Sequence, residues 1–226
     1  MPATDAGAAS PIAGAPPDTP APEGWIERVL DREGKCLLAT VAVCSAPLLI
    51  GFVVGYLLIA TGWFPVDKDS ARTFEQDLAK RLEMPWQDRF AAIAKPNFTC
   101  FAVFLVGIFT LGLEAVVHLG YLGVATGITV AKLTSAGVPL GHVVTLLLPH
   151  AIFELPGFLL AGSLGFRAGL MFLRYLRGRL LVLPGEVRRM SFVAAASFGF
   201  LVAAAFVEAI VTPAMAAFRG VGPFPH

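Results

Sequence analysis

Two pairs of ionisable side chains stand inside otherwise apolar stretches of this sequence. Glu114 and His118 are four residues apart, and so are His150 and Glu154. On a helix the members of such a pair lie on one face, within reach of each other. Imidazole and carboxylate suit zinc, iron and manganese, so each pair could bind a metal. Each could equally be a neutralised, hydrogen-bonded pair that holds helices together. Because the sequence supplies no third ligand, we expect no metal site and no cofactor.

A fifth ionisable residue, Glu208, is the single charge of the last apolar stretch. A charged side chain near the centre of a membrane helix costs about 2.5–3.5 kcal/mol on insertion scales, so such residues are usually paired or functional. The depths estimated from the span boundaries put Glu208 level with His150 and put Glu114 nearer the cytoplasm. We therefore expect an intramembrane polar core in which His150, Glu154 and Glu208 share hydrogen bonds, with the Glu114–His118 pair beside it.

Two prolines, Pro149 and Pro156, bracket the His150–Glu154 turn. A proline inside a membrane helix frees backbone carbonyl groups, which neighbouring helices or water must then satisfy. Broken helices of this kind form binding sites in many transporters. A kink needed only for packing is the alternative interpretation, and the sequence leaves both open.

Catalytic signatures are absent from the sequence. It contains no H-E-x-x-H, no G-x-x-x-x-G-K-[ST] and no G-x-S-x-G motif. Its three cysteines, Cys36, Cys44 and Cys100, form no C-x-x-C pair and are expected to be small packing residues. The net charge of +1 gives no nucleic-acid signature. We therefore expect a protein that is not an enzyme and binds no nucleic acid.

The amino-acid composition indicates which kind of fold holds these ionisable residues in place. Hydrophobic residues make up 56% of the 226 residues and charged residues only 15%, whereas soluble domains carry about 25% charged residues. An all-α, polytopic transmembrane helix bundle is therefore predicted at 36–218, with the lipid bilayer as its solvent. About five spans fit, with joints at Leu119-Gly120 and at 137–141; we expect them at 36–61, 97–117, 120–136, 142–165 and 190–218.

Three further segments complete the predicted organisation. Residues 1–24 are rich in Ala, Pro, Gly and Thr and predict a disordered N-terminal tail. Residues 25–35 predict an amphipathic helix at the membrane interface. A polar loop at 66–96 contains an amphipathic helical pattern that Pro85 should end, with apolar residues at Phe74, Leu78 and Leu82.

Basic residues set the expected orientation. They gather before the first span and again at 166–189, and positively charged flanks favour the cytoplasmic side. Five crossings put both basic segments inside, so we expect a multi-pass plasma-membrane protein with a cytoplasmic N-terminus and an extracytoplasmic loop at 66–96. Glycines four residues apart predict close helix contacts, at Gly51/Gly55, Gly123/Gly127 and Gly165/Gly169.

Three segments carry a resemblance to a known family. Leu148-Pro-His-Ala-Ile-Phe-Glu-Leu-Pro156, continuing to Ala161-Gly-Ser-Leu-Gly165, resembles the signature of the stage II sporulation protein M family. Ala205-Phe-Val-Glu-Ala-Ile-Val-Thr-Pro213 looks like that family's closing motif. Asn97 and the glycines that follow it are similar to the middle section. The resemblance covers about residues 36–217.

The resemblance implies a fold of five or six spans with a polar core at His150, Glu154, Pro156 and Glu208. Two positions depart from the family pattern: Ala151 replaces a glycine and Leu119 replaces an asparagine. Both departures concern close packing more than charge. In spore-forming bacteria the namesake anchors peptidoglycan-degrading enzymes at the membrane during engulfment, and relatives also occur in organisms that form no spores.

Two functions therefore stay open at the level of sequence. The first is a membrane scaffold or anchor that recruits other membrane or extracytoplasmic proteins through the outer loop and the spans, and that could form a homo-oligomer. The alternative is a permease-like subunit in which His150, Glu154 and Glu208 line a polar path. An intramembrane hydrolase is the least favoured interpretation.

Overall fold

A computed structural model describes residues 25–65, 70–178 and 185–211 of the chain. Contacts divide the chain into two compact units, Met1–Cys36 and Leu37–His226. Of the first unit the structure describes only a helical segment that starts at Trp25. The predicted N-terminal tail at 1–24 lies outside the described residues.

Every element assigned in the described part of the chain is helical, and this confirms the predicted all-α fold. The elements are α1 (Trp25–Ala60), α2 (Ser70–Glu83), α3 (Trp86–Leu105), a short 3-10 helix η1 (Val106–Ile108), α4 (Leu113–Ser135), α5 (Leu140–Leu176), α6 (Glu186–Phe206) and a π-helical turn η2 (Val207–Val211). The predicted interfacial helix at 25–35 is the first part of α1 rather than a separate helix.

Four helical segments have the length and apolar composition to cross a membrane, so the protein is a polytopic membrane protein. At a rise of 1.5 Å per residue each covers the roughly 30 Å hydrocarbon core of a bilayer. They are Leu37–Ala60, Leu113–Ser135, Leu147–Leu176 and Glu186–Val211.

The predicted second span, 97–117, is divided between two helices. Residues 97–105 belong to α3, and α4 begins at Leu113 after a turn in which Leu111 and Gly112 have φ angles of 56° and 82°. The predicted break at Leu119-Gly120 is wrong, because α4 runs through it. The positive φ at Gly112 starts a new helix within an uninterrupted apolar run, so hydropathy alone could not locate the turn.

The polar segment between α1 and α3 is shorter than predicted. Its amphipathic pattern does form a helix, α2, which ends at Glu83 before Pro85, as expected. From Trp86 onward, however, the chain already belongs to α3, which packs against α5 and α6 and buries Asn97 and Phe104. The last part of the predicted loop at 66–96, from Trp86 onward, therefore belongs to the helix bundle.

Helices α1 and α4 approach so closely that no side chain fits between them. A Cβ atom added at Gly51 would collide with the backbone carbonyl group of Gly120, and one at Gly123 with that of Leu48. Gly55 and Gly127 stand in the same close contact one turn further along. The predicted glycine contact faces are therefore real, because only glycine allows backbones this near to each other.

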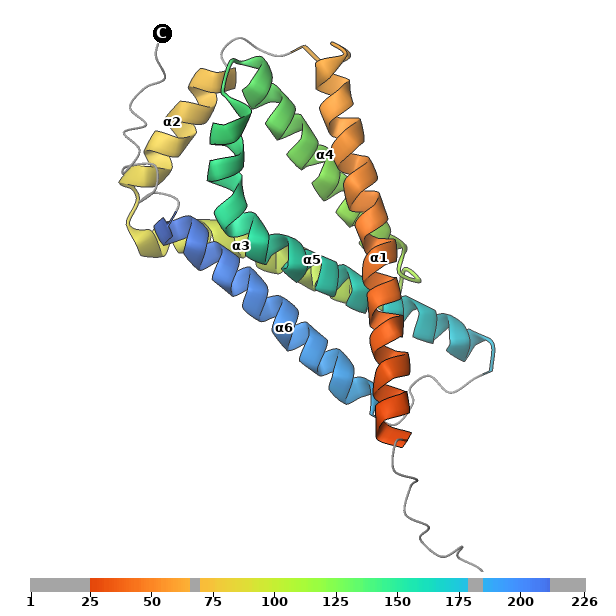
Figure 1. Ribbon diagram of the computed structural model, residues 1–226. Helices are drawn as coiled ribbons and strands as arrows, with labels where there is room; N and C mark the ends of the chain where they lie inside the picture. Colours follow the sequence, from red (N-terminus) through yellow and green to blue (C-terminus); the bar gives the residue numbers. More distant parts are fainter. Residues whose placement is uncertain (1–24, 66–69, 179–184, 212–226) are drawn as a thin grey trace, which may run out of the picture. The chain divides into compact units, whose positions relative to one another are not determined.

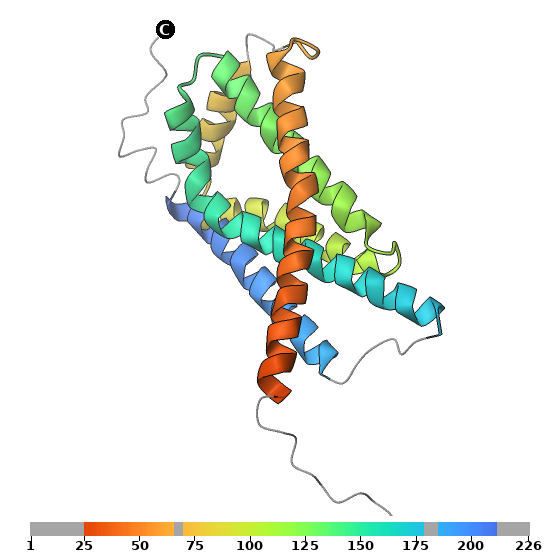
Figure 2. The same ribbon diagram turned by 45° about the vertical axis from the view of Figure 1, so that its right-hand side comes forward.

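Helix α5 is bent but continuous from Leu140 to Leu176, so Pro149 and Pro156 lie inside one helix. Its bend is visible in both views, and its longer second part runs beside α6 (Figures 1 and 2). Because the helix continues past the predicted span end at 165, Arg167 and Arg174 are helical rather than part of a loop.

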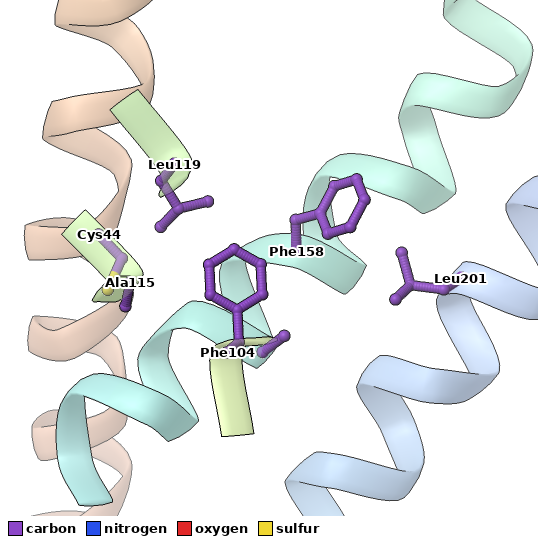
Figure 3. Close-up of a cluster of buried hydrophobic side chains, with 7 residues drawn as sticks. Cys44, Phe104, Ala115, Leu119, Phe158 and Leu201 are labelled. Carbon is purple, nitrogen blue, oxygen red and sulfur yellow. The ribbon is translucent and has the colours of Figure 1, made fainter. Parts of the chain in front are cut away.

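The hydrophobic core is shared by five helices. Phe104 of α3 is fully buried and lies between Leu119 of α4 and Phe158 of α5 (Figure 3). Cys44 of α1 and Leu201 of α6 complete the buried cluster together with alanines. α3 thus contributes to the core as α1, α4, α5 and α6 do.

Candidate functional site: a polar cluster in the helix bundle

His150 and Glu154 form the centre of the site on α5. Nε2 of His150 lies 4.0 Å from Oε2 of Glu154, and the two side chains are 14% and 25% exposed. One helical turn separates them, as the sequence spacing predicted. The pair is therefore largely buried, on the stretch of α5 that also holds Pro149 and Pro156.

Two other helices bring a polar side chain to this pair. The side chain of the buried Asn97 of α3 lies within hydrogen-bonding reach of Glu154. Glu208, in the π-helical turn η2, lies near enough to interact electrostatically with both His150 and Glu154. Since π-helical turns are rare and occur often at functional sites, the position of Glu208 marks this cluster as a candidate site. We call these four residues the polar cluster.

One polar atom of the cluster has no partner. Nδ1 of His150 is buried, and no hydrogen-bond partner lies within reach of it among the described residues. A buried polar group without a hydrogen bond costs about 1–3 kcal/mol. The cluster is thus not fully satisfied by the part of the chain that the structure describes.

The amphipathic helix α2 contacts the polar cluster from outside. A guanidinium nitrogen of Arg81 lies 3.5 Å from Oε1 of Glu208, with side chains 55% and 27% exposed. Arg81 is in the last turn of α2, so this ion pair ties that helix to η2. The carboxylate of Glu208 therefore faces the buried His150 and Glu154 on one side and a partly exposed arginine on the other.

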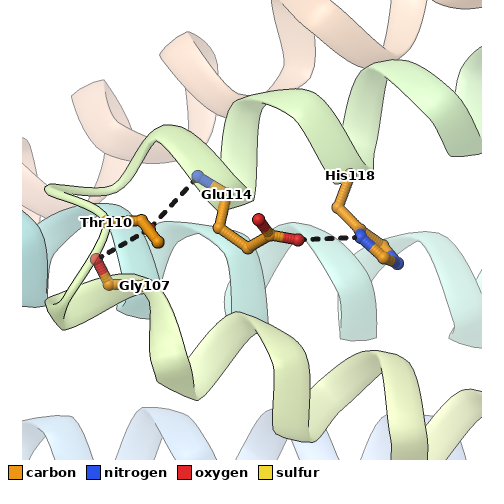
Figure 4. A network of polar contacts seen from close by, with 4 residues as sticks. All are labelled: Gly107, Thr110, Glu114 and His118. Atoms are coloured by element: carbon orange, nitrogen blue, oxygen red, sulfur yellow. Dashed lines mark hydrogen bonds and ion pairs between the residues drawn. The ribbon is translucent and has the colours of Figure 1, made fainter.

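Glu114 and His118 form a second, separate pair at the start of α4. Nδ1 of His118 lies 3.2 Å from Oε1 of Glu114, and both side chains are about one-third exposed. The hydroxyl group of Thr110 accepts a hydrogen bond from the Glu114 N–H group at 3.3 Å and donates one to the Gly107 carbonyl group at 3.3 Å (Figure 4). The turn between α3 and α4 thus fixes the place of this pair.

The five ionisable residues named from the sequence therefore divide between two places. Cys100 of α3 lies near both Glu154 and Glu114, so α3 lies between the polar cluster and the Glu114–His118 pair. Among the described residues, no group of three or more His, Cys, Asp or Glu side chains could hold a metal ion. Electrostatic interactions and hydrogen bonds between paired side chains are the chemistry that this geometry supports.

Sequence reasoning missed three contributors to polar contacts. Asn97 was visible as a polar residue opening an apolar run, but nothing in the sequence paired it with Glu154. Nothing in the sequence distinguishes Arg81, since it is one of several charged residues on a polar segment. Arg167 of α5 lies 3.1 Å from Oε1 of Glu186 at the start of α6, and the two side chains are only 16% and 8% exposed. This buried ion pair lies within a segment interpreted only as a basic flank.

Comparison with known proteins places this chain in a family. The family model described as stage II sporulation protein M matches residues 44–213, which include the whole polar cluster. An uncharacterized protein of the archaeon Methanocaldococcus jannaschii is 24% identical over 171 residues, covering 75% of this chain and 91% of the relative. No solved structure matches the chain. Since the family model covers most of the chain, the protein belongs to the stage II sporulation protein M family.

Proposed function

We propose that this protein is a plasma-membrane scaffold without catalytic activity of its own, which recruits extracytoplasmic or membrane proteins through α2. The contact between Arg81 and Glu208 carries the proposal, because it ties an exposed, charged helix to the buried part of the bundle. Gln76, Asp77, Lys80 and Glu83 of α2 are exposed. A helix with both signs of charge, held at one end, can present a fixed pattern to a partner.

The proposed orientation follows from α3. This helix shares the core with four helices long and apolar enough to cross a membrane, so we count it as a fifth crossing. Five crossings place α2 outside and the arginine-rich end of α5 inside, with the N-terminus in the cytoplasm. The contact of α2 with α4 agrees with this count, because the end of α4 then lies on the outer side as well.

Exchange of two exposed charges on α2 tests the scaffold. In Asp77→Lys/Lys80→Asp the net charge is unchanged but the local pattern is reversed, so opposite charges at an interface become like charges. We expect recovery of crosslinked partners from native membranes to fall about tenfold, the effect of 1.4 kcal/mol. The control, Thr73→Ala/Gln76→Ala, alters two exposed positions of the same helix without changing charge and should leave recovery intact. Equal recovery of crosslinked partners with both variants would show that α2 is not the docking helix.

A second function, a permease-like subunit, is favoured by one observation. The polar cluster joins α3, α5 and η2 inside the bundle and leaves Nδ1 of His150 without a partner among the described residues. A path for protons or small ions would use such groups. Proton uptake by reconstituted vesicles under a membrane potential tests this alternative. Uptake that Glu154→Gln abolishes would favour transport over scaffolding.

A further inference from the structure

An open groove lies between α3 and α4, on the side of α3 that carries Cys100. It has a volume of about 350 Å³ and is lined by Lys95, Pro96, Thr99, Cys100, Val103 and His118. Sites for small molecules are commonly about 300–1,000 Å³. The groove is therefore large enough for part of a lipid-sized ligand, and it shares no lining residue with the polar cluster or with α2.

Its long axis follows α3. Lys95, Thr99 and Val103 recur at every fourth position and so line one face of the helix over about 12 Å. His118 of α4 forms the facing wall, and Glu114 holds it at 3.2 Å (Figure 4). The ring of Phe104 also packs against it, with its centroid 5.5 Å from that of the imidazole. Because these contacts hold His118, the groove is built into the bundle.

The two ends of the groove differ in chemistry. Lys95 is exposed and is the last charge before an uncharged run from Pro96 to Leu113. Lys95 is the tenth of the 20 residues of α3, and its long side chain can extend along the helix towards Trp86 and bring the ammonium group to the lipid headgroups. Beyond it the Thr99 hydroxyl group is used within α3, since it donates to the Lys95 carbonyl group at 2.9 Å. The deeper part, lined by Cys100 and Val103, is apolar.

We propose that the groove binds one anionic phospholipid. The ammonium group of Lys95 contacts the headgroup phosphate, and one acyl chain lies along Thr99, Cys100 and Val103 against His118. A cation at the mouth and an apolar floor match a ligand that is anionic at one end and hydrocarbon at the other. A neutral or soluble occupant would use only one of these ends. This proposal is independent of partner docking at α2.

Native mass spectrometry of the full-length, delipidated protein tests the proposal by titration with phosphatidylglycerol and, separately, phosphatidylcholine. We expect one phosphatidylglycerol per chain to bind roughly fivefold tighter than phosphatidylcholine, as one basic residue implies. Lys95→Glu should remove that preference. Lys132→Glu, which changes a lysine in the last turn of α4, is the matched control and should preserve it.

A second pair of variants tests the acyl-chain half of the groove. Val103→Trp should fill it and weaken binding of both lipids, whereas Val117→Trp, at an exposed position outside the groove, should weaken neither. Equal binding of the two lipids by the unchanged protein would overturn the proposal without any variant. So would a lipid-free dimer in which crosslinks place a helix of a second copy against Val103.

Discussion

A guanidinium nitrogen of Arg81 in α2 lies 3.5 Å from a carboxylate oxygen of Glu208 in η2. The sequence predicted Arg81 in a polar loop with an amphipathic helical pattern and Glu208 in an intramembrane polar core, and it did not pair the two. The pair joins an exposed helix to the π-helical turn that also faces His150 and Glu154.

Removing the arginine should free α2 without unfolding the bundle. In Arg81→Ala we expect faster amide hydrogen exchange at 70–83, because α2 loses its ion pair with Glu208. The melting temperature should stay close to that of the parent, since partly exposed ion pairs contribute about 0–1 kcal/mol. Lys80→Ala is the control, because it removes an exposed charge from the same last turn of α2. Identical exchange in both variants would mean that the Arg81 contact does not hold α2.

Truncation inside the polar cluster should be more damaging. His150→Ala and Glu208→Ala each leave a neighbour without its electrostatic partner, so each should lower the free energy of unfolding by about 1–3 kcal/mol. Thermal melting in detergent measures the change. His142→Ala, at an exposed position near the start of α5, should melt as the parent does. A shared network is excluded if both cluster variants also melt at the parent's temperature.

The crossing of α1 and α4 predicts a clear difference between glycines. Gly51→Ala and Gly123→Ala would each force a methyl group into a backbone carbonyl group, so we expect a loss of about 1–3 kcal/mol. Gly199→Ala in α6 is the matched control, because a Cβ there meets no atom within 4 Å. Alanine is also the better helix former. Equal melting temperatures of the three variants in detergent would contradict the close crossing of α1 and α4.

The proposed orientation predicts which sites are reachable from outside. In a cysteine-free chain, a single cysteine at Asp77 should react with an impermeant thiol reagent in intact cells, and one at Arg177 should react only after lysis. The reason is that five crossings put α2 and the end of α5 on opposite sides. Labelling of Arg177→Cys but not Asp77→Cys in intact cells would show that the protein has the opposite orientation.

Composition and glycine spacing were enough to predict the membrane helices and their close contacts, because both depend on local chemistry. Helix boundaries were harder, since the run from Asn97 to Leu113 carries no charge and its turn depends on the backbone conformation of Leu111 and Gly112. The pairs Glu114–His118 and His150–Glu154 followed from helical periodicity. The contacts of Asn97 and Arg81 did not, because they join residues far apart in sequence and only tertiary packing brings them together.

Glu154→Gln tests the central claim most directly, because the amide retains hydrogen bonding with Asn97 but carries no charge and cannot take up a proton. The measurement is complementation of a deletion strain at matched expression, with thermal melting of the purified variant as the check on folding. If the polar cluster serves only to hold a scaffold together, the variant should fold and complement as the parent does. A variant that melts at the parent's temperature but fails to complement would contradict the scaffold and show that the cluster carries protons or ions.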